Sequence, residues 1–180
     1  FPTITSKFVD KKFLLESVNN DLKSIGLEYK LLLKIFEPGS AMDIDKRYSF
    51  ILMKNDGKEF GLHEVGYGLA QLIPLLIRKN YYLSAMNKRA TTIVREPEAN
   101  IHPELQANIA ANLVKSINND NSKNSIIVET HSEHFIRGVQ LEIAKGNISK
   151  DDVSILYVGK RKNGNSYIKE IELEEKGRFK

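Results

Sequence analysis

The sequence predicts an α/β fold in which a mostly parallel sheet is flanked by helices and preceded by an antiparallel hairpin segment. Two observations support this class. From Gly68 onward, short apolar strands alternate with amphipathic helices, the order of elements that builds a parallel sheet. Before that point, two segments with alternating apolar and polar residues are separated by turn residues, as in antiparallel strands.

The composition is that of one globular domain, 1–180. Of the 180 residues, 41% are hydrophobic and 28% are charged, as in average soluble proteins. There is no cysteine, which excludes a disulfide framework and a thiolate metal site. The longest apolar run, residues 72–77, is too short to span a membrane. The net charge of +4 is scattered along the chain, which gives little support to a nucleic-acid surface. We expect a cytoplasmic protein without a membrane partner.

The first third of the chain is expected to form one helix and an antiparallel sheet. Apolar residues recur at helical spacing over about 6–24, and they alternate with polar residues over 27–35. A turn and a polar loop, 37–46, lead to a second strand over 48–54. An Asn-Asp-Gly hairpin turn then connects that strand to a partner at 60–63.

The remainder is expected to alternate between helices and strands. Helices are predicted over 67–80, where Pro74 should bend or weaken the helix, and over 103–118. Strands are predicted at 91–94 and 125–128.

The C-terminal part continues this alternation and ends in a hairpin. A polar loop at 118–122 precedes the second of these strands, and a helix from about Phe135 should end at Gly146. A hairpin then pairs 153–158 with 167–173 through an Asn-Gly turn.

Three motifs carry chemistry, and the first is the glycine-containing start of the helix at 67–80. Gly66 and Gly68 would present backbone N–H groups, unshielded by side chains, at the positive end of a helix, which suits a phosphate. A tight loop that enters a buried helix would use the same residues.

The second motif is the acidic turn Glu96-Pro97-Glu98 directly after a strand. A carboxylate in this position could polarise a water for attack on a phosphate. The alternative is that both glutamates are solvated turn residues or helix-capping acids.

The third motif is His131, which follows the next strand. Its imidazole could hydrogen-bond a phosphate oxygen or hold the attacking water. A metal site is the rival interpretation, with His131 and His134 as ligands and His102 and Glu129 as further candidates.

Taken together and in this order, the motifs resemble the signature loop, Walker B motif and switch histidine of ABC-type ATPases in the RecF, SMC and OLD (overcoming lysogenization defect) group. The likeness covers about residues 17–179, and it is greatest to bacterial AAA-type ATPases with GxGxxQxLP, EPExHLHPxLQ and ETHSEH motifs. It implies a P-loop NTPase fold of the ABC-ATPase type.

The resemblance also implies roles for individual residues. Glu96 falls at the position of the catalytic carboxylate, and His131 falls where the switch histidine senses the γ-phosphate of ATP. Glu98 and His102 belong to the region of the D-loop, which lies at the dimer interface. The residues expected near the γ-phosphate of ATP on the opposite subunit are Gly66, Tyr67, Gly68 and Gln71.

Two departures from the family pattern matter. Arg95 stands where the family keeps an acidic residue that orders Mg²⁺, and a guanidinium would repel the metal. The phosphate-binding motif Gly-x-x-x-x-Gly-Lys-Ser/Thr is absent from the sequence given. The chain also begins with Phe1. We therefore expect the C-terminal part of a head, with 1–63 as helix and antiparallel strands, 64–180 as the motif region, and a separate N-terminal Walker A half as partner.

The implied function is that of a head which dimerises around ATP and Mg²⁺ and hydrolyses the nucleotide, in DNA maintenance or anti-phage defence, with DNA as a further partner. The alternative is a degenerate, non-hydrolysing head that controls assembly, which Arg95 favours. A nuclease would need an acidic metal cluster, and the sequence does not indicate one. The chain alone is not expected to hydrolyse ATP.

Overall fold

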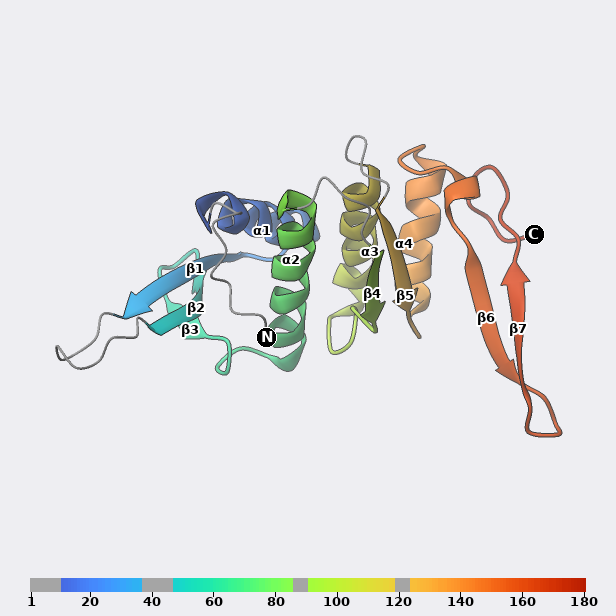
Figure 1. Cartoon of the computed structure of the whole chain (residues 1–180), viewed down its shortest axis with the longest axis horizontal. Coiled ribbons are helices and arrows are strands. Elements are labelled where there is room, and N and C mark those ends of the chain that lie inside the picture. Colours follow the sequence, from blue (N-terminus) through green and yellow to red (C-terminus); the bar gives the residue numbers. More distant parts are fainter. Residues whose placement is uncertain (1–10, 37–46, 86–90, 119–123) are drawn as a thin grey trace.

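The computed structural model describes residues 11–36, 47–85, 91–118 and 124–180 (Figure 1). It confirms the predicted α/β class, with a small parallel sheet, flanking helices and antiparallel hairpins. Three sequence predictions lie outside the described residues in whole or in part: the first turns of the N-terminal helix, the loop at 37–46 and most of the loop at 118–122.

The N-terminal part packs one helix against a three-stranded antiparallel sheet. Helix α1 spans Lys11–Ile25, and its apolar stripe is buried. The sheet has the order β1-β2-β3, formed by Tyr29–Phe36, Arg47–Lys54 and Glu59–Gly61. Leu31 lies opposite Leu52 in the register, and both side chains are fully buried. The predicted hairpin segment is therefore present, with strand ends shifted by one or two residues.

The middle of the chain alternates as predicted. Helix α2 spans Tyr67–Ala85 and is not interrupted at Pro74. It ends five residues later than the pattern predicted. Strand β4 (Thr91–Arg95) and strand β5 (Ser125–Glu129) pair in parallel, with α3 (Pro103–Asn118) as the crossover. Figure 1 shows α2, α3, β4 and β5 following one another along the molecule.

The C-terminal part is a helix followed by a hairpin. Helix α4 spans Glu133–Ala144 and packs against α3. A short 3₁₀ helix, η1 (Lys150–Asp152), leads to the antiparallel strands β6 (Ile155–Lys160) and β7 (Ser166–Ile171). Figure 1 shows this hairpin at the C-terminal end of the molecule, beyond α4.

The parallel sheet is covered on one face only. Along β4 and β5 burial alternates, so that Val94 and Val128 lie on the covered side while Ile93 and Ile127 point outward. Ile93 is 76% exposed and Ile127 is 57% exposed. Parallel sheets are normally buried on both faces, so the exposure of these two isoleucines is unusual.

A buried polar cluster links the first three helices. The Lys79 ammonium on α2 lies 2.8 Å from the Asp21 carboxylate on α1 and donates a hydrogen bond to Asn112 on α3. Burial lowers the pKa of Lys79 from its usual value, and the attraction of Asp21 opposes that shift only in part. Among the described residues, no helix is long and apolar enough to cross a membrane.

Candidate active site

Two side chains predicted to act on a nucleotide meet at the ends of neighbouring parallel strands. Arg95 and Glu129, the last residues of β4 and β5, are register partners, so the residues that follow them emerge at the same edge of the sheet. Glu96 and His131 face each other there, with 3.7 Å between Glu96 Oε1 and His131 Nε2. The His131 side chain is 80% exposed and can reach a ligand.

The backbone of Glu96 is held in an unusual conformation. Its φ is +44°, in the left-handed region that residues with a side chain rarely adopt. The surrounding hydrogen bonds impose it: Glu96 N–H donates to the Glu129 carbonyl over 2.7 Å, and the Glu96 carbonyl accepts from Ala99 N–H over 3.0 Å. Strain of this kind occurs preferentially at functional sites.

Glu98 has a different environment from Glu96. It is only 5% exposed, and its Oε1 accepts hydrogen bonds from the Thr130 hydroxyl and from His131 N–H. Its Oε2 is buried and has no hydrogen-bond partner in the described part of the chain. The structure thus separates the two acids of the turn into an accessible carboxylate and a buried acceptor.

Arg95 forms an ion pair with Glu129, its partner on the neighbouring strand. Its Nε lies 3.3 Å from Glu129 Oε2, and both side chains are largely exposed. The positive charge that was expected to repel a cation therefore has a carboxylate beside it.

Among the described residues, three side chains lie close enough together to hold a divalent cation. One ligand atom each of Glu96, Glu129 and His131 lies within 4.8 Å of the others. Two carboxylates and an imidazole suit several divalent ions, Mg²⁺ through its preference for carboxylates. Of the metal ligands considered from the sequence, His131 and Glu129 belong to this group, whereas His102 and His134 do not.

The two signature glycines differ in their surroundings. A Cβ on Gly68 would lie 2.4 Å from the Asn100 carbonyl oxygen, whereas nothing lies within 4 Å of a Cβ on Gly66. Gly68 therefore packs the start of α2 against the loop that follows Glu96. Gly66, Tyr67 and Gln71 are exposed, which leaves them accessible to a ligand.

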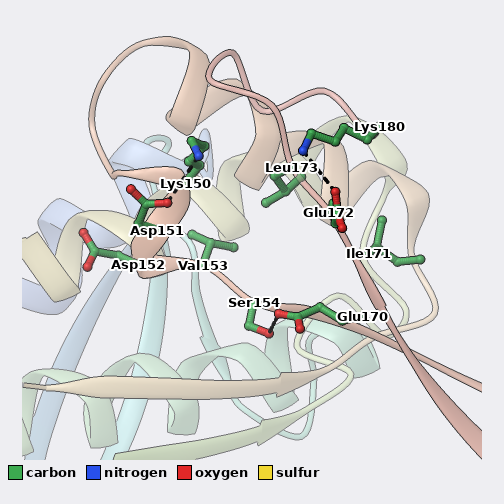
Figure 2. A pocket seen from close by; sticks show the side chains of 10 residues that line it. All are labelled: Lys150, Asp151, Asp152, Val153, Ser154, Glu170, Ile171, Glu172, Leu173 and Lys180. Atoms are coloured by element: carbon green, nitrogen blue, oxygen red, sulfur yellow. Dashed lines mark hydrogen bonds and ion pairs between the residues drawn. The ribbon is translucent and has the colours of Figure 1, made fainter.

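A separate hollow of about 570 Å³ lies at the other end of the chain, where η1, β6, β7 and the C-terminus meet (Figure 2). Its two lysines are paired with carboxylates: Lys150 contacts Asp151 and Glu175, and Lys180 contacts Glu172. The Glu175 and Asp151 carboxylates raise the pKa of Lys150 through hydrogen bonds and charge. This hollow lies outside the strand-end cluster and offers no comparable set of reactive groups.

Most of the chain matches a known protein family. Residues 4–136 match the family described as AAA ATPase domain. The chain belongs to this family. The match includes Gly66, Glu96 and His131, and it ends within α4. No curated protein matches the chain in sequence.

Solved structures of SMC heads share the fold of this AAA ATPase domain. An SMC ATPase from a study of ATP-driven dimerisation and DNA-stimulated activation superposes with a TM-score of 0.62 at 11% identity, over 89% of this chain and 84% of its own. The Smc head of Pyrococcus yayanosii gives 0.65 at 12%, and that of Thermotoga maritima gives 0.55 at 12%. These two superpositions cover 92% and 91% of this chain, but only 28% and 49% of the two solved chains, the first of which also includes a coiled coil and joint.

Some members of the site were not found from the sequence. Thr130 and Ser132 were read only as part of a motif, yet Thr130 binds Glu98, and the Ser132 hydroxyl hydrogen-bonds Gln106 at the start of α3. Ser132 also caps α4 by accepting from Phe135 N–H over 3.0 Å. A serine directly before an apolar helix was the available signal for the cap, whereas the contacts with Glu98 and Gln106 depend on tertiary structure.

Proposed function

We propose that this AAA ATPase domain is the part of an ATP-hydrolysing head that activates the attacking water. Glu96 acts as the general base: its carboxylate accepts a proton from the water as the water oxygen bonds to the γ-phosphorus, and the bond from that phosphorus to ADP breaks, so that ADP leaves. The observation that carries this proposal is the meeting of Glu96 and His131 at the ends of two parallel strands, 3.7 Å apart.

His131 and the signature residues supply the remaining contacts in this proposal. His131 donates a hydrogen bond to a γ-phosphate oxygen, which its exposure permits. Glu129 lies in the same group and would offer its carboxylate to Mg²⁺, which leaves Glu96 free to accept the proton. The ion would neutralise charge on the phosphates. Gly66, Tyr67, Gly68 and Gln71 contact the nucleotide of a second head, with Glu98 and His102 on the loop at the interface.

A Walker A segment and a second head are the proposed partners. The outward face of β4 and β5 leaves Ile93 and Ile127 uncovered between polar residues at the strand ends, as expected if another segment of an ATPase head packs on it. The SMC ATPase with the same fold comes from a study of ATP-driven dimerisation. By analogy of fold, we propose dimerisation around ATP, in DNA maintenance or anti-phage defence and with DNA as a further partner.

The test is ATP hydrolysis with Mg²⁺ by the complete polypeptide, in which this chain is joined to its Walker A segment. Wild type is compared with Glu96→Gln and with Glu175→Gln, a control at an exposed glutamate near the C-terminus. We expect Glu96→Gln to lower kcat by about 10²- to 10⁴-fold, the usual value of a general base. Activity that survives Glu96→Gln would disprove the role of Glu96.

The second candidate is a degenerate head that binds nucleotide without hydrolysing it, and the observation that favours it is Arg95. In the same assay, Arg95→Glu would raise hydrolysis sharply if the arginine disables the site. If Arg95 only neutralises Glu129, the substitution places two carboxylates side by side and no gain is expected. Nucleotide binding without hydrolysis by the wild type would support the degenerate head.

A further inference from the structure

We infer that Glu98 is a positioning residue, which holds the loop after β5 so that His131 faces Glu96. The inference rests on the proposed function, because the Glu96–His131 pair is what Glu98 positions. It assigns to the second acid of the turn a role distinct from contact with nucleotide, since Glu98 is buried and oriented toward the protein interior.

The contacts join the two loops that carry the reactive groups. Glu98 is two residues from Glu96, and its Oε1 accepts from the Thr130 hydroxyl and from His131 N–H, the latter over 3.2 Å. The hydrogen bond to His131 N–H fixes the backbone of the residue whose imidazole must be placed. One carboxylate oxygen thus ties both loops together without touching the exposed face of the site.

Thr130 transmits the same restraint to the next helix. Its hydroxyl accepts from Ser132 N–H over 3.0 Å while it donates to Glu98. Ser132 in turn caps α4 and hydrogen-bonds Gln106, whose amide donates to the Ile101 carbonyl over 2.9 Å. This hydrogen-bond network returns to the loop after Glu96, so it connects the loops on both sides of His131.

The His131 side chain is held loosely by its surroundings. It is 80% exposed, and its polar side-chain contact among the described residues is the 3.7 Å approach to Glu96. Its position is therefore set by its backbone, which Glu98 restrains. A buried carboxylate is a stronger acceptor than a neutral group, because hydrogen bonds to a charged oxygen are shorter and stronger.

The experiment separates positioning from simple stabilisation with two matched pairs in the complete polypeptide. Thr130→Val removes the hydroxyl at nearly constant volume, and Thr130→Ser retains it. Glu98→Leu removes the acceptor, and Glu98→Gln retains an oxygen that can accept. Steady-state ATP hydrolysis with Mg²⁺ gives kcat and KM for each, and amide hydrogen exchange follows the backbone at His131.

We expect Thr130→Val and Glu98→Leu to lower kcat by about 10- to 100-fold through misplacement of His131, with KM changed less than about twofold. Thr130→Ser and Glu98→Gln should retain most of the wild-type kcat. Exchange at His131 N–H should accelerate in the two disruptive variants and remain slow in the two conservative ones. If Glu98→Leu fails to fold, the Thr130 pair decides.

Two failures can be told apart. Wild-type hydrolysis that does not depend on Glu96 would overturn the proposed function and, with it, this inference. Hydrolysis that depends on Glu96 but keeps its kcat in Thr130→Val and Glu98→Leu would overturn the positioning role alone. Equal losses in the disruptive and the conservative variants would do the same, because the hydrogen bonds would then not be the cause.

Discussion

Glu96 combines a reactive side chain with a backbone conformation that is unfavourable for any residue except glycine. A left-handed residue with a Cβ costs about 1–2 kcal/mol, which is partly offset here by the hydrogen bonds of the turn. A protein retains such strain where the position of the side chain matters more than the stability that a different residue would give.

Because of this strain, we expect glycine to be more favourable than alanine at position 96, the reverse of the usual order. Glu96→Gly should be more stable than Glu96→Ala by about 0.5–1 kcal/mol, because glycine adopts φ +44° without a Cβ clash. Ala99, which has no positive φ, is the control: Ala99→Gly should cost about 0.5–1 kcal/mol instead. Urea unfolding of the variants measures both, and an alanine at position 96 as stable as glycine would contradict the strain.

Glu142 predicts a pH dependence of stability that is independent of the active site. The side chain is buried, which by itself raises its pKa, but hydrogen bonds from Asn147 and Lys145 outweigh burial and lower the pKa below its usual value. The unfolded chain therefore binds the proton more readily than the native one, so Glu142 stabilises the fold above about pH 4.5 and loses this effect as the pH falls through its native pKa.

The comparison is between wild type and Glu142→Gln. At neutral pH the variant should be less stable by about 2 kcal/mol, the usual cost of losing a hydrogen-bonded charge. The difference should shrink as the pH is lowered below 4.5, as measured by chemical unfolding at a series of pH values. Glu133→Gln, at an exposed ion pair on α4, should show little difference at any pH. A constant difference for Glu142→Gln would show that the carboxylate acts through packing.

At the scale of elements, the start of α2 and the loop after β4 form one packed unit. Gly68 is required there by close approach, since a Cβ would lie 2.4 Å from a backbone oxygen of Asn100 and 2.7 Å from the Ile101 side chain. The two glycines that suggested a single phosphate-binding motif thus differ: Gly68 is closely packed, whereas Gly66 has free space around it.

The two glycines should respond differently to the same substitution. Gly68→Ala should lower the free energy of unfolding by about 1–3 kcal/mol, because backbone must move to admit the methyl group. Gly66→Ala should change it by less than about 0.5 kcal/mol, since the added Cβ meets nothing. Thermal or urea unfolding decides this, and equal effects would mean that the close approach at Gly68 relaxes at little cost.

The periodicity of the sequence was sufficient to predict the helices and strands, but not how they pack against one another. The apolar spacing of α1 and α3 and the Asn-Gly and Asn-Asp-Gly turns locate helices and hairpins because each signal is local. The length of α2 beyond residue 80 was missed, since charged and polar residues close its pattern while Lys79 is in fact buried against Asp21. The hydrogen bonds of Glu98 were also missed, because Thr130 and His131 lie 32 and 33 residues from it in the sequence.

At the scale of the whole molecule, the uncovered face of β4 and β5 is the feature that sequence could not reveal. A short apolar strand predicts burial, and Ile93 and Ile127 have the pattern of core residues, yet they are exposed in this chain. The alternation in burial along both strands shows that one face of the sheet has its helices and the other does not.

If a Walker A segment covers this face, the cost of truncating these side chains depends on whether that segment is present. In the complete polypeptide, Ile93→Ala and Ile127→Ala should each lower the free energy of unfolding by about 2–5 kcal/mol, as in a core. In the 180-residue chain the same substitutions should each cost less than about 0.5 kcal/mol, because exposed side chains lose few contacts. Val94→Ala, on the covered side, is the control that should cost the same in both. Equal, small effects of Ile93→Ala and Ile127→Ala in both proteins would mean that the face remains open and that the Walker A segment binds elsewhere.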